Sequence, residues 1–463
     1  MESSPPLSRQ TALGLDDEGD KFEYIGALYI ILVWMTDGSR GASRRWQLFT
    51  ALAIAIGFVA LNARAYDGYF QDDELDTLTW APSRQIGEYL RWLISPVFNK
   101  DNFRPVGHAY FTLMGRAFGL NFPPWITPLF AIHLLNGALV FFILRRLKAD
   151  AWRALASVAF FLLSAAALDA YWKPMYVFDL LCATFSLACI LAYMQRRWVV
   201  SFLAFWLAYK AKEMAVMLPA VLLVYEHWMG ERKYLRLAPF LLVSLSFGLQ
   251  GIFLNPNKDN DYTFRFNLAA LARTVPFYFE RLIFVAAAVI FIRDKRVGFS
   301  LAAMLLLMIP LLFLPGRLFE AYAYLPLACG AMALGVAATH VSPKWIVIAL
   351  LLWAPLNLRQ WRRESRATLA ADDRNFAFVD AVMKWGEKHP APDPLVYTGV
   401  PVNFHAWGVT AAWIIAHNRQ PVESYYFDSA EGRNAIEKQT VVLGSWKNGE
   451  RLELGYHQAK ATR

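Results

Sequence analysis

The chain has 463 residues, of which 57% are hydrophobic and only 18% are charged, and its formal net charge is +9. Soluble domains are about 45–50% apolar and about 25% charged, so this balance argues against a soluble protein and favours a polytopic membrane protein. The basic residues gather in short loops between apolar runs, which indicates membrane topology rather than binding to nucleic acid. The three cysteines all lie in apolar runs, which argues against a disulfide framework or a CxxC metal site.

Residues 1–45 precede the first clear apolar span and are predicted to be a polar or interfacial segment. The stretch 1–21 is polar and acidic and lacks the basic start of a standard signal peptide. The apolar run 24–35 is shorter than the roughly 17–25 residues that a membrane span needs. We therefore expect this segment to be interfacial, disordered or an upstream extension of the true start.

Apolar segments of spanning or near-spanning length then recur along the chain and predict about eleven transmembrane helices. The predicted helices are 46–63, 125–144, 152–170, 176–194, 198–209, 214–229, 235–254, 275–292, 297–314, 322–338 and 345–358. They define an all-α transmembrane domain over 46–358, with a long loop over 64–124. Two stretches of this loop, 84–98 and 106–118, mix apolar and polar residues at helical spacing, which predicts amphipathic helices on the membrane surface.

The distribution of arginine and lysine sets the orientation of these helices. Basic residues occur in every second loop, in phase over the whole chain, at 44–45, 145–148, 196–197, 230–233, 293–296 and 344. Because basic loops stay on the cytoplasmic side, the loop 64–124 is predicted to be extracytoplasmic, as is everything after residue 358. The sequence therefore predicts a multi-pass protein of the inner or plasma membrane with its long first loop outside.

The segment 359–463 is more polar and is predicted to form a small extracytoplasmic α/β domain, of a size that is common for domains. Helices are expected over 376–388 and 404–417. Strands are expected over 395–398, 422–427 and 441–443.

Three consecutive carboxylates, Asp72, Asp73 and Glu74, follow the first predicted span in the stretch "DGYFQDDELDTLTW". A carboxylate beside the membrane is costly unless it is solvated, paired or used in chemistry. One interpretation is a wet loop just past a helix end. The other is function, because adjacent carboxylates raise each other's pKa, which suits a general base.

Several cations and polar groups lie at the same predicted outer face as the acidic cluster. They are Arg104 in "NFRPVGHAY", Asp179 in "YWKPMYVFDLL", Lys212 and Glu213 in "YKAKEMAVMLP", and Arg317 and Tyr324 in "GRLFEAYAYLP". Acid groups together with phosphate-binding cations fit the transfer of a sugar from a phosphate leaving group, because Arg and Lys neutralise the charge that builds on the phosphate.

Each of these residues also has a structural alternative. Arg104 would anchor a loop to lipid head groups, and Arg317 would extend from a helix end toward the interface. Lys212 and Glu213 would form an ion pair. Asp179 would face a wet cavity or a partner. His133 is expected to pack or to form hydrogen bonds, because no His/Asp/Glu spacing repeats a metal motif.

At these residues the chain resembles the GT-C superfamily of glycosyltransferases, and within it the membrane part of the transmembrane-and-tetratricopeptide O-mannosyltransferases. The resemblance covers roughly 46–338. The matching positions are the acidic pair Asp72-Asp73, Arg104-Pro105, "HLLN" from His133, Asp-Leu-Leu from Asp179, Lys212-Glu213, and Tyr-Leu-Pro from Tyr324. Two positions depart from the family pattern, Val177 and Ala321, where the family often has a basic residue, and Arg317 lies one turn from the second. The tetratricopeptide tail is absent, which leaves the acceptor open.

The resemblance implies a hexosyltransferase that moves a sugar, with inversion, from a polyprenyl-phosphate donor to an acceptor hydroxyl on the extracytoplasmic face. Asp72 or Asp73 would be the general base, and Arg104, Lys212 and Arg317 would hold the departing phosphate. Glu74, His133, Asp179, Glu213 and Tyr324 would complete the substrate site. The polyprenyl tail would lie between helices among membrane lipids, and the acceptor would be a protein, a glycan or a lipid. Mg²⁺ or Mn²⁺ suits carboxylates and phosphates, but the sequence does not require a metal.

A multi-pass transporter or lipid flippase is the alternative function. Transporters tend to have internal repeats and ionisable groups at the bilayer midplane. The sequence has no clear repeat, and its charges lie at predicted helix ends. A scaffold that keeps the fold without activity is a third hypothesis, against which the intact Asp72-Asp73 and Lys212-Glu213 argue.

Overall fold

The computed structural model describes residues 44–97, 103–253, 261–447 and 449–458. Its two compact units are Met1–Ala63 and Arg64–Arg463. The described part of the first unit is helix α2 (Arg44–Leu61), and the short helix η1 (Ala63–Asp67) follows it. The predictions for residues 1–43, including the apolar run 24–35, lie outside the described residues.

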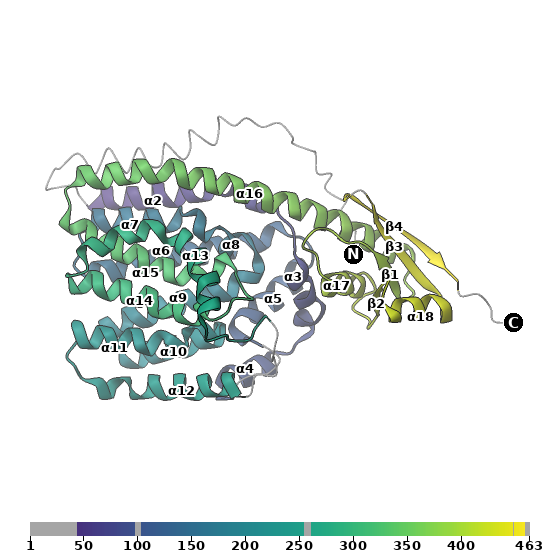
Figure 1. Cartoon of the computed structure of the whole chain (residues 1–463), viewed down its shortest axis with the longest axis horizontal. Coiled ribbons are helices and arrows are strands. Elements are labelled where there is room, and N and C mark those ends of the chain that lie inside the picture. Colours follow the sequence, from purple (N-terminus) through teal and green to yellow (C-terminus); the bar gives the residue numbers. More distant parts are fainter. Residues whose placement is uncertain (1–43, 98–102, 254–260, 448, 459–463) are drawn as a thin grey trace. The chain divides into compact units, whose positions relative to one another are not determined.

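The chain is a multi-pass membrane protein built from apolar helices (Figure 1). Six described helical stretches are long and apolar enough to cross a membrane, and a seventh is a pair of helices bent by 60°. The predicted count of eleven spans stays a prediction.

The helices after the first loop are α6 (Pro123–Arg146), α7 (Ala151–Leu162), η3 (Ala165–Ala167), α8 (Leu168–Trp172), η4 (Pro174–Tyr176), α9 (Val177–Met194), α10 (Trp198–Ala211), η5 (Glu213–Met217), α11 (Leu218–Trp228), η6 (Tyr234–Leu237), α12 (Ala238–Phe253), α13 (Leu268–Leu282), η7 (Ile283–Phe291), α14 (Lys295–Leu312), η8 (Glu320–Ala323), α15 (Tyr324–Ala337) and η9 (Ala338–His340).

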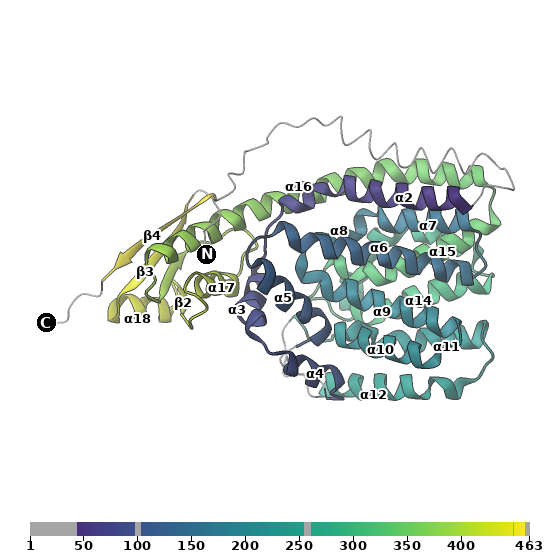
Figure 2. The ribbon, with the colours of Figure 1, turned by 180° about the vertical axis from the view of Figure 1, so that it is seen from behind.

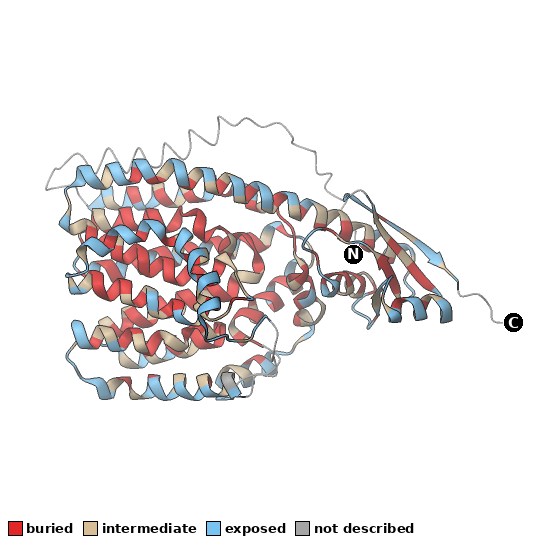
Figure 3. Cartoon of the chain, in the orientation of Figure 1, coloured by how far each residue is buried: buried red, intermediate tan, exposed pale blue. Residues whose placement is uncertain are grey.

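The helix α15 is buried along its whole length except at Leu334, and Figure 3 shows in red how much of the helical region is buried. Its small residues allow close helix packing, which is typical of membrane proteins. A Cβ atom at Gly335 would lie 2.8 Å from Leu144 and 2.9 Å from Ser157, and one at Gly330 would lie 2.7 Å from Val285. Glycine at these two positions therefore brings the neighbouring helices against α15.

The first loop contains α3 (Asp72–Trp80), η2 (Ala81–Ser83), α4 (Ile86–Ile94) and α5 (Pro105–Phe118). The helices expected over 84–98 and 106–118 are confirmed as α4 and α5. Along α4, Ile86, Leu90 and Ile94 recur every fourth residue and are strongly exposed. Such an apolar stripe is typical of a helix that lies in the membrane interface. The helix α3 was not predicted, because its acidic first turn was interpreted as part of the loop.

The C-terminal part begins with the long helix α16 (Pro343–Lys388), which continues without a break past residue 358. At 1.5 Å per residue its 46 residues span about 69 Å. Beyond it follow β1 (Leu395–Thr398), α17 (Ala406–Ala416), β2 (Ser424–Tyr426), α18 (Ala430–Lys438), β3 (Val441–Lys447) and β4 (Arg451–His457). Figures 1 and 2 show α16 running along the helical bundle and on to these strands.

The four strands form one sheet in the order β2-β1-β3-β4. The strand β1 pairs in parallel with β2 and β3, and β3 pairs with β4 in antiparallel fashion. Val396, Ala435 and Val441 form a small buried core. The expected strands over 395–398, 422–427 and 441–443 are confirmed, as is the helix over 404–417, whereas α18 and β4 were not predicted.

Candidate active site

The acidic cluster forms the first turn of α3, where the positive end of the helix dipole favours carboxylates. Glu74 is completely buried, and both of its oxygens accept backbone N–H groups, from Gln71 at 2.6 Å and from Met175 at 2.9 Å. Burial raises the pKa of Glu74 to about 7, although the charge of Lys173 and the two backbone donors lower it. Through these two hydrogen bonds, Glu74 links the start of α3 to Met175, which lies just before α9.

Asp72 is buried, and both of its oxygens are engaged. Its Oδ1 accepts the backbone N–H of Asp73 at 2.9 Å, and its Oδ2 accepts the backbone N–H of His405 at 3.2 Å. The imidazole Nδ1 of His405 also contacts Oδ2. His405 is the N-cap residue of α17, so this carboxylate joins the first loop to the C-terminal part of the chain.

Asp73 is more exposed than Asp72 and accepts a hydrogen bond at Oδ1 from the indole N–H of Trp407, at 2.9 Å. Burial, followed by the charge of Asp72, raises the pKa of Asp73. The hydrogen bond from Trp407 and the charges of Arg317 and His405 offset part of this rise. Asp73 is thus an accessible carboxylate whose affinity for a proton is higher than usual.

Arg104 is the N-cap residue of α5, and its Nε lies 2.9 Å and 3.1 Å from the two oxygens of Glu213. The guanidinium also lies over the ring of Phe178. Burial is the largest influence on the pKa of Arg104 and lowers it, but the charge and hydrogen bond of Glu213, together with Tyr322 and Asp179, outweigh burial, so the net shift is upward. Conversely, Arg104 outweighs burial at Glu213 and lowers its pKa. Both groups are therefore held in their charged forms.

Lys212 donates to both oxygens of Asp179 at 2.7 Å, and its ammonium lies 3.9 Å from the ring centre of Tyr322. The guanidinium of Arg317 donates to the hydroxyl of the same Tyr322 at 3.4 Å and lies over the ring of Tyr262 at 4.3 Å. Two of the predicted cations thus share one tyrosine.

The phenol of Tyr262 connects the acidic pair with the cations. Burial is the main reason that its pKa is raised. Arg317 and Arg104 lower this pKa, whereas Tyr322 and Asp73 raise it. Asp73, Arg317 and Arg104 therefore all lie within electrostatic range of one side chain.

His133 and Tyr324, also predicted for the site, form a different cluster inside the bundle. The hydroxyl of Tyr324 donates to Nδ1 of His133 at 2.6 Å, and Nε2 of His133 lies 3.2 Å from the carbonyl oxygen of Leu162. Asn136 donates to the same hydroxyl at 3.1 Å and to the carbonyl of Leu180 at 3.2 Å. This cluster supports the backbone of α9 beside Asp179.

Sequence reasoning missed three side chains of this region: Tyr262, His405 and Trp407. Tyr322 was placed at the predicted outer face as part of "GRLFEAYAYLP", but it was not assigned to the substrate site. His405 and Trp407 are separated from Asp72 and Asp73 by more than 330 residues, and no local pattern connects them.

No group of three or more His, Cys, Asp or Glu side chains in the described parts of the chain is arranged to hold a metal ion. The donors that face Asp72 and Asp73 are an imidazole, an indole N–H and backbone N–H groups. The reaction proposed for these carboxylates therefore assigns no role to the Mg²⁺ or Mn²⁺ that the sequence allows.

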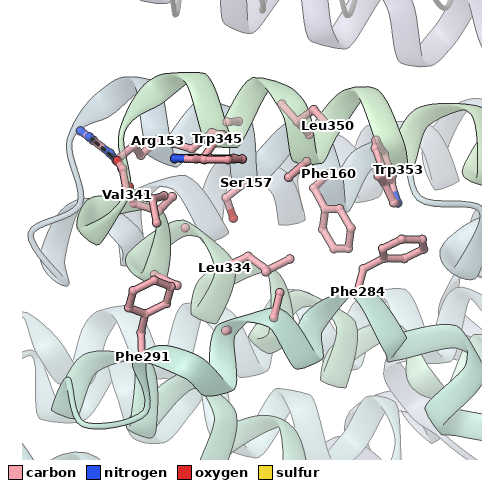
Figure 4. Close-up of a pocket in the computed structure, with 18 of the residues that line it drawn as sticks. Arg153, Ser157, Phe160, Phe284, Phe291, Leu334, Val341, Trp345, Leu350 and Trp353 are labelled. Atoms are coloured by element: carbon pink, nitrogen blue, oxygen red, sulfur yellow. Dashed lines mark hydrogen bonds between the residues drawn. The ribbon is translucent and has the colours of Figure 1, made fainter.

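A separate cavity of about 370 Å³ lies between α7, η7, α15 and α16 (Figure 4). Its lining is apolar and aromatic, and its two polar side chains, Arg153 and Ser157, bind backbone carbonyls. In α15 it begins at Leu334, whereas Tyr324 begins the other end of that helix, about 15 Å away. This cavity is distinct from the charged region, and its lining is mainly apolar.

No protein-family model and no curated protein matches the chain. Two solved structures of ArnT from Cupriavidus metallidurans do match it. The apo structure is 12% identical, has a TM-score of 0.54, and the match covers 86% of this chain and 94% of that chain. The structure bound to undecaprenyl phosphate is 13% identical, has a TM-score of 0.51, and the match covers 90% of this chain and 98% of that chain. The chain therefore shares the fold of these two ArnT structures.

Proposed function

We propose that this protein transfers a sugar from a polyprenyl-phosphate donor to an acceptor hydroxyl, with inversion at the anomeric carbon. The observation that carries the proposal is that Lys212 and Arg317 meet at Tyr322, and that the charge of Arg317 also lowers the pKa of Asp73. A base and phosphate-binding cations are the two parts that this transfer needs. The shared fold with an ArnT structure bound to undecaprenyl phosphate supports the same donor class.

Arg317 is the cation best prepared to receive a phosphate. Arg104 and Lys212 already have carboxylate partners in Glu213 and Asp179. Within the described residues, Arg317 has no carboxylate partner, and its buried Nε forms no hydrogen bond. The guanidinium lies over the rings of Tyr262 and Phe319, and because its hydrogen bond to the Tyr322 hydroxyl is long, its terminal N–H groups can form charge-assisted bonds to phosphate oxygens.

The proposed reaction uses the acidic pair as the base and the cations as the phosphate-binding groups. A carboxylate of the pair Asp72-Asp73 takes the proton of the acceptor hydroxyl as its oxygen forms a bond to the anomeric carbon. The bond from that carbon to the phosphate oxygen breaks, and the phosphate leaves with the electron pair. Arg317, assisted by Arg104 and Lys212, stabilises the charge that develops on the leaving oxygen.

The positions of the buried charges argue for a transferase over a transporter. Asp179 is the third residue of α9, and Lys212 is the C-cap of α10. Asp72 lies in the first turn of α3. Ionisable groups of transporters typically lie near the bilayer midplane, whereas these three lie at helix ends. We place the reacting face outside the cytoplasm, because the basic loops lie at the opposite helix ends.

The proposal is tested by the release of undecaprenyl phosphate from a panel of undecaprenyl-phosphate-linked hexoses, with the protein in lipid vesicles. The wild type should release the lipid phosphate from at least one donor of the panel. The double variant Asp72→Asn/Asp73→Asn should be slower by at least about 100-fold, the typical contribution of a general base, and should still bind undecaprenyl phosphate.

Asp428→Asn is the matched control, because Asp428 is an exposed carboxylate of the C-terminal part. It should release the lipid phosphate at the wild-type rate. A double variant that is as fast as this control would disprove the role of the acidic pair.

A further inference from the structure

The helix α17 of the C-terminal part binds both members of the acidic pair. His405 contacts Asp72 through its backbone N–H and its ring, and the indole N–H of Trp407 binds Asp73. The two rings of α17 stack on one another, with centroids 4.3 Å apart and planes inclined by 7°. One aromatic unit therefore positions two neighbouring carboxylates.

The backbone of α17 is packed directly on α3. A Cβ atom at Gly408 would lie 2.5 Å from the Cβ of Asp72 and 2.9 Å from its Cα, so only glycine permits this approach. At the other end of α17, Arg419 donates to the carbonyl of Leu78 at 3.2 Å. The two helices are thus joined at both ends, and Figures 1 and 2 show them side by side.

The contacts differ between the two carboxylates. Both oxygens of Asp72 are occupied, and the side chain is buried. Asp73 is more exposed, and within the described residues its Oδ2 accepts no hydrogen bond. Among the described contacts of the pair, Oδ2 of Asp73 is therefore the oxygen best placed to receive a proton from a substrate.

We propose that His405 and Trp407 are positioning residues that divide the acidic pair, so that Asp72 anchors α17 and Asp73 accepts the proton of the acceptor hydroxyl. This inference rests on the proposed function. The proton moves from the acceptor oxygen to the free Oδ2 of Asp73, while the bond from Trp407 to Oδ1 fixes the plane of the carboxylate. The C-terminal part of the chain is then required for the chemical step.

The charged groups that face Asp73 predict how each substitution changes its proton affinity. They are Asp72 and Asp76 on α3, His405 on α17 and Arg317 before η8. Loss of the Trp407 bond raises the pKa of Asp73, because that bond favours the ionised form. Loss of the negative charge of Asp72 lowers the pKa of Asp73. The two substitutions therefore shift the pKa in opposite directions.

The test compares Trp407→Phe with Asp72→Asn in the release of undecaprenyl phosphate as a function of pH. Trp407→Phe keeps an aromatic ring and should lower kcat about 10- to 100-fold, the cost of a misplaced catalytic group. Its KM should stay within about twofold, and the acid limb of its pH profile should move to higher pH. Asp72→Asn should move the acid limb to lower pH, and Asp73→Asn should be the slowest single variant.

Trp385→Phe is the matched control for Trp407→Phe. Trp385 also stacks on a histidine, His389, but its buried indole nitrogen has no hydrogen-bond partner among the described residues. The variant Trp385→Phe should have the kcat and the pH profile of the wild type. If Trp407→Phe matched this control in kcat and in pH profile, or if Asp72→Asn were slower than Asp73→Asn, the division of the pair would be wrong.

A second measurement separates this inference from the proposed function. The carboxylate of Asp73 is titrated by infrared difference spectroscopy of the wild type against Asp73→Asn, without any substrate. In the Trp407→Phe background its titration should move to higher pH. An unchanged titration overturns the inference even if sugar transfer is confirmed. A shifted titration supports it even if no donor of the panel reacts.

Discussion

At the scale of single residues, three consecutive carboxylates have three different environments. Glu74 is buried among backbone donors, Asp72 is buried and bound by His405, and Asp73 is more exposed and bound by Trp407. The cluster was found in the sequence because it places three consecutive carboxylates shortly after a membrane-type segment, where a carboxylate is costly unless it is solvated, paired or used. It could not predict the separate roles, because the partners Met175 and His405 are distant along the chain. Only folding brings these partners to the cluster.

Glu74 predicts a pH dependence of stability. Its pKa is raised from 4.5 to about 7 in the folded protein. Its contribution to stability is therefore complete below about pH 4.5 and is lost as the pH rises through 7. The thermal midpoint of the wild type should exceed that of Glu74→Gln by more at pH 5 than at pH 8, as measured in detergent at one fixed scan rate.

The exposed Glu88→Gln is the control, and its difference from the wild type should be the same at both pH values. If Glu74→Gln also showed a difference that does not change with pH, Glu74 would not carry the shifted pKa.

At the scale of elements, the periodicity of apolar residues predicted α4, α5 and three of the strands. It missed α3 and α18, whose residues are too polar to show an apolar face, and β4, which lies at the sheet edge. The contact between α3 and α17 was also out of reach, because it depends on a close approach at Gly408 rather than on a pattern within either helix.

This close approach predicts the effect of Gly408→Ala. The new Cβ would meet backbone and Cβ atoms of Asp72, which cannot move aside as a flexible side chain would. Overpacking of this kind typically costs about 1–3 kcal/mol. We expect a lower thermal midpoint together with slower sugar transfer.

Gly87→Ala, also in a helix, has open space around its Cβ and should leave both properties unchanged. A variant Gly408→Ala with the stability and rate of Gly87→Ala would show that α17 does not rest on α3.

At the scale of the whole molecule, the motifs predicted the fold that ArnT shares, although sequence identity is only 12–13%. Alternating basic loops predicted the orientation, which follows from charge alone. The long helix α16 was predicted only as separate pieces over 345–358 and 376–388. The stretch between them is polar, and its buried Asp372 is held by Lys173 from another helix-end segment.

The predicted orientation is tested with single cysteines and a thiol reagent that cannot cross membranes. The three native cysteines are buried, so labelling of the parent chain should be low. Glu437→Cys in α18 should be labelled from outside in intact cells, and Lys233→Cys in a basic loop only after the membrane is opened. The reverse pattern would put the acidic pair in the cytoplasm.

The most direct test of the central claim, that Asp73 and Arg317 serve one phosphate-binding pocket, is the affinity for undecaprenyl phosphate. Arg317→Gln should weaken binding, because a phosphate-binding cation is lost. Asp73→Asn should strengthen it, because a negative charge near the phosphate is removed. Opposite shifts from these two variants are the result that the account predicts. If Asp73→Asn left the affinity unchanged while Arg317→Gln weakened it, the carboxylate and the cation would not share a pocket.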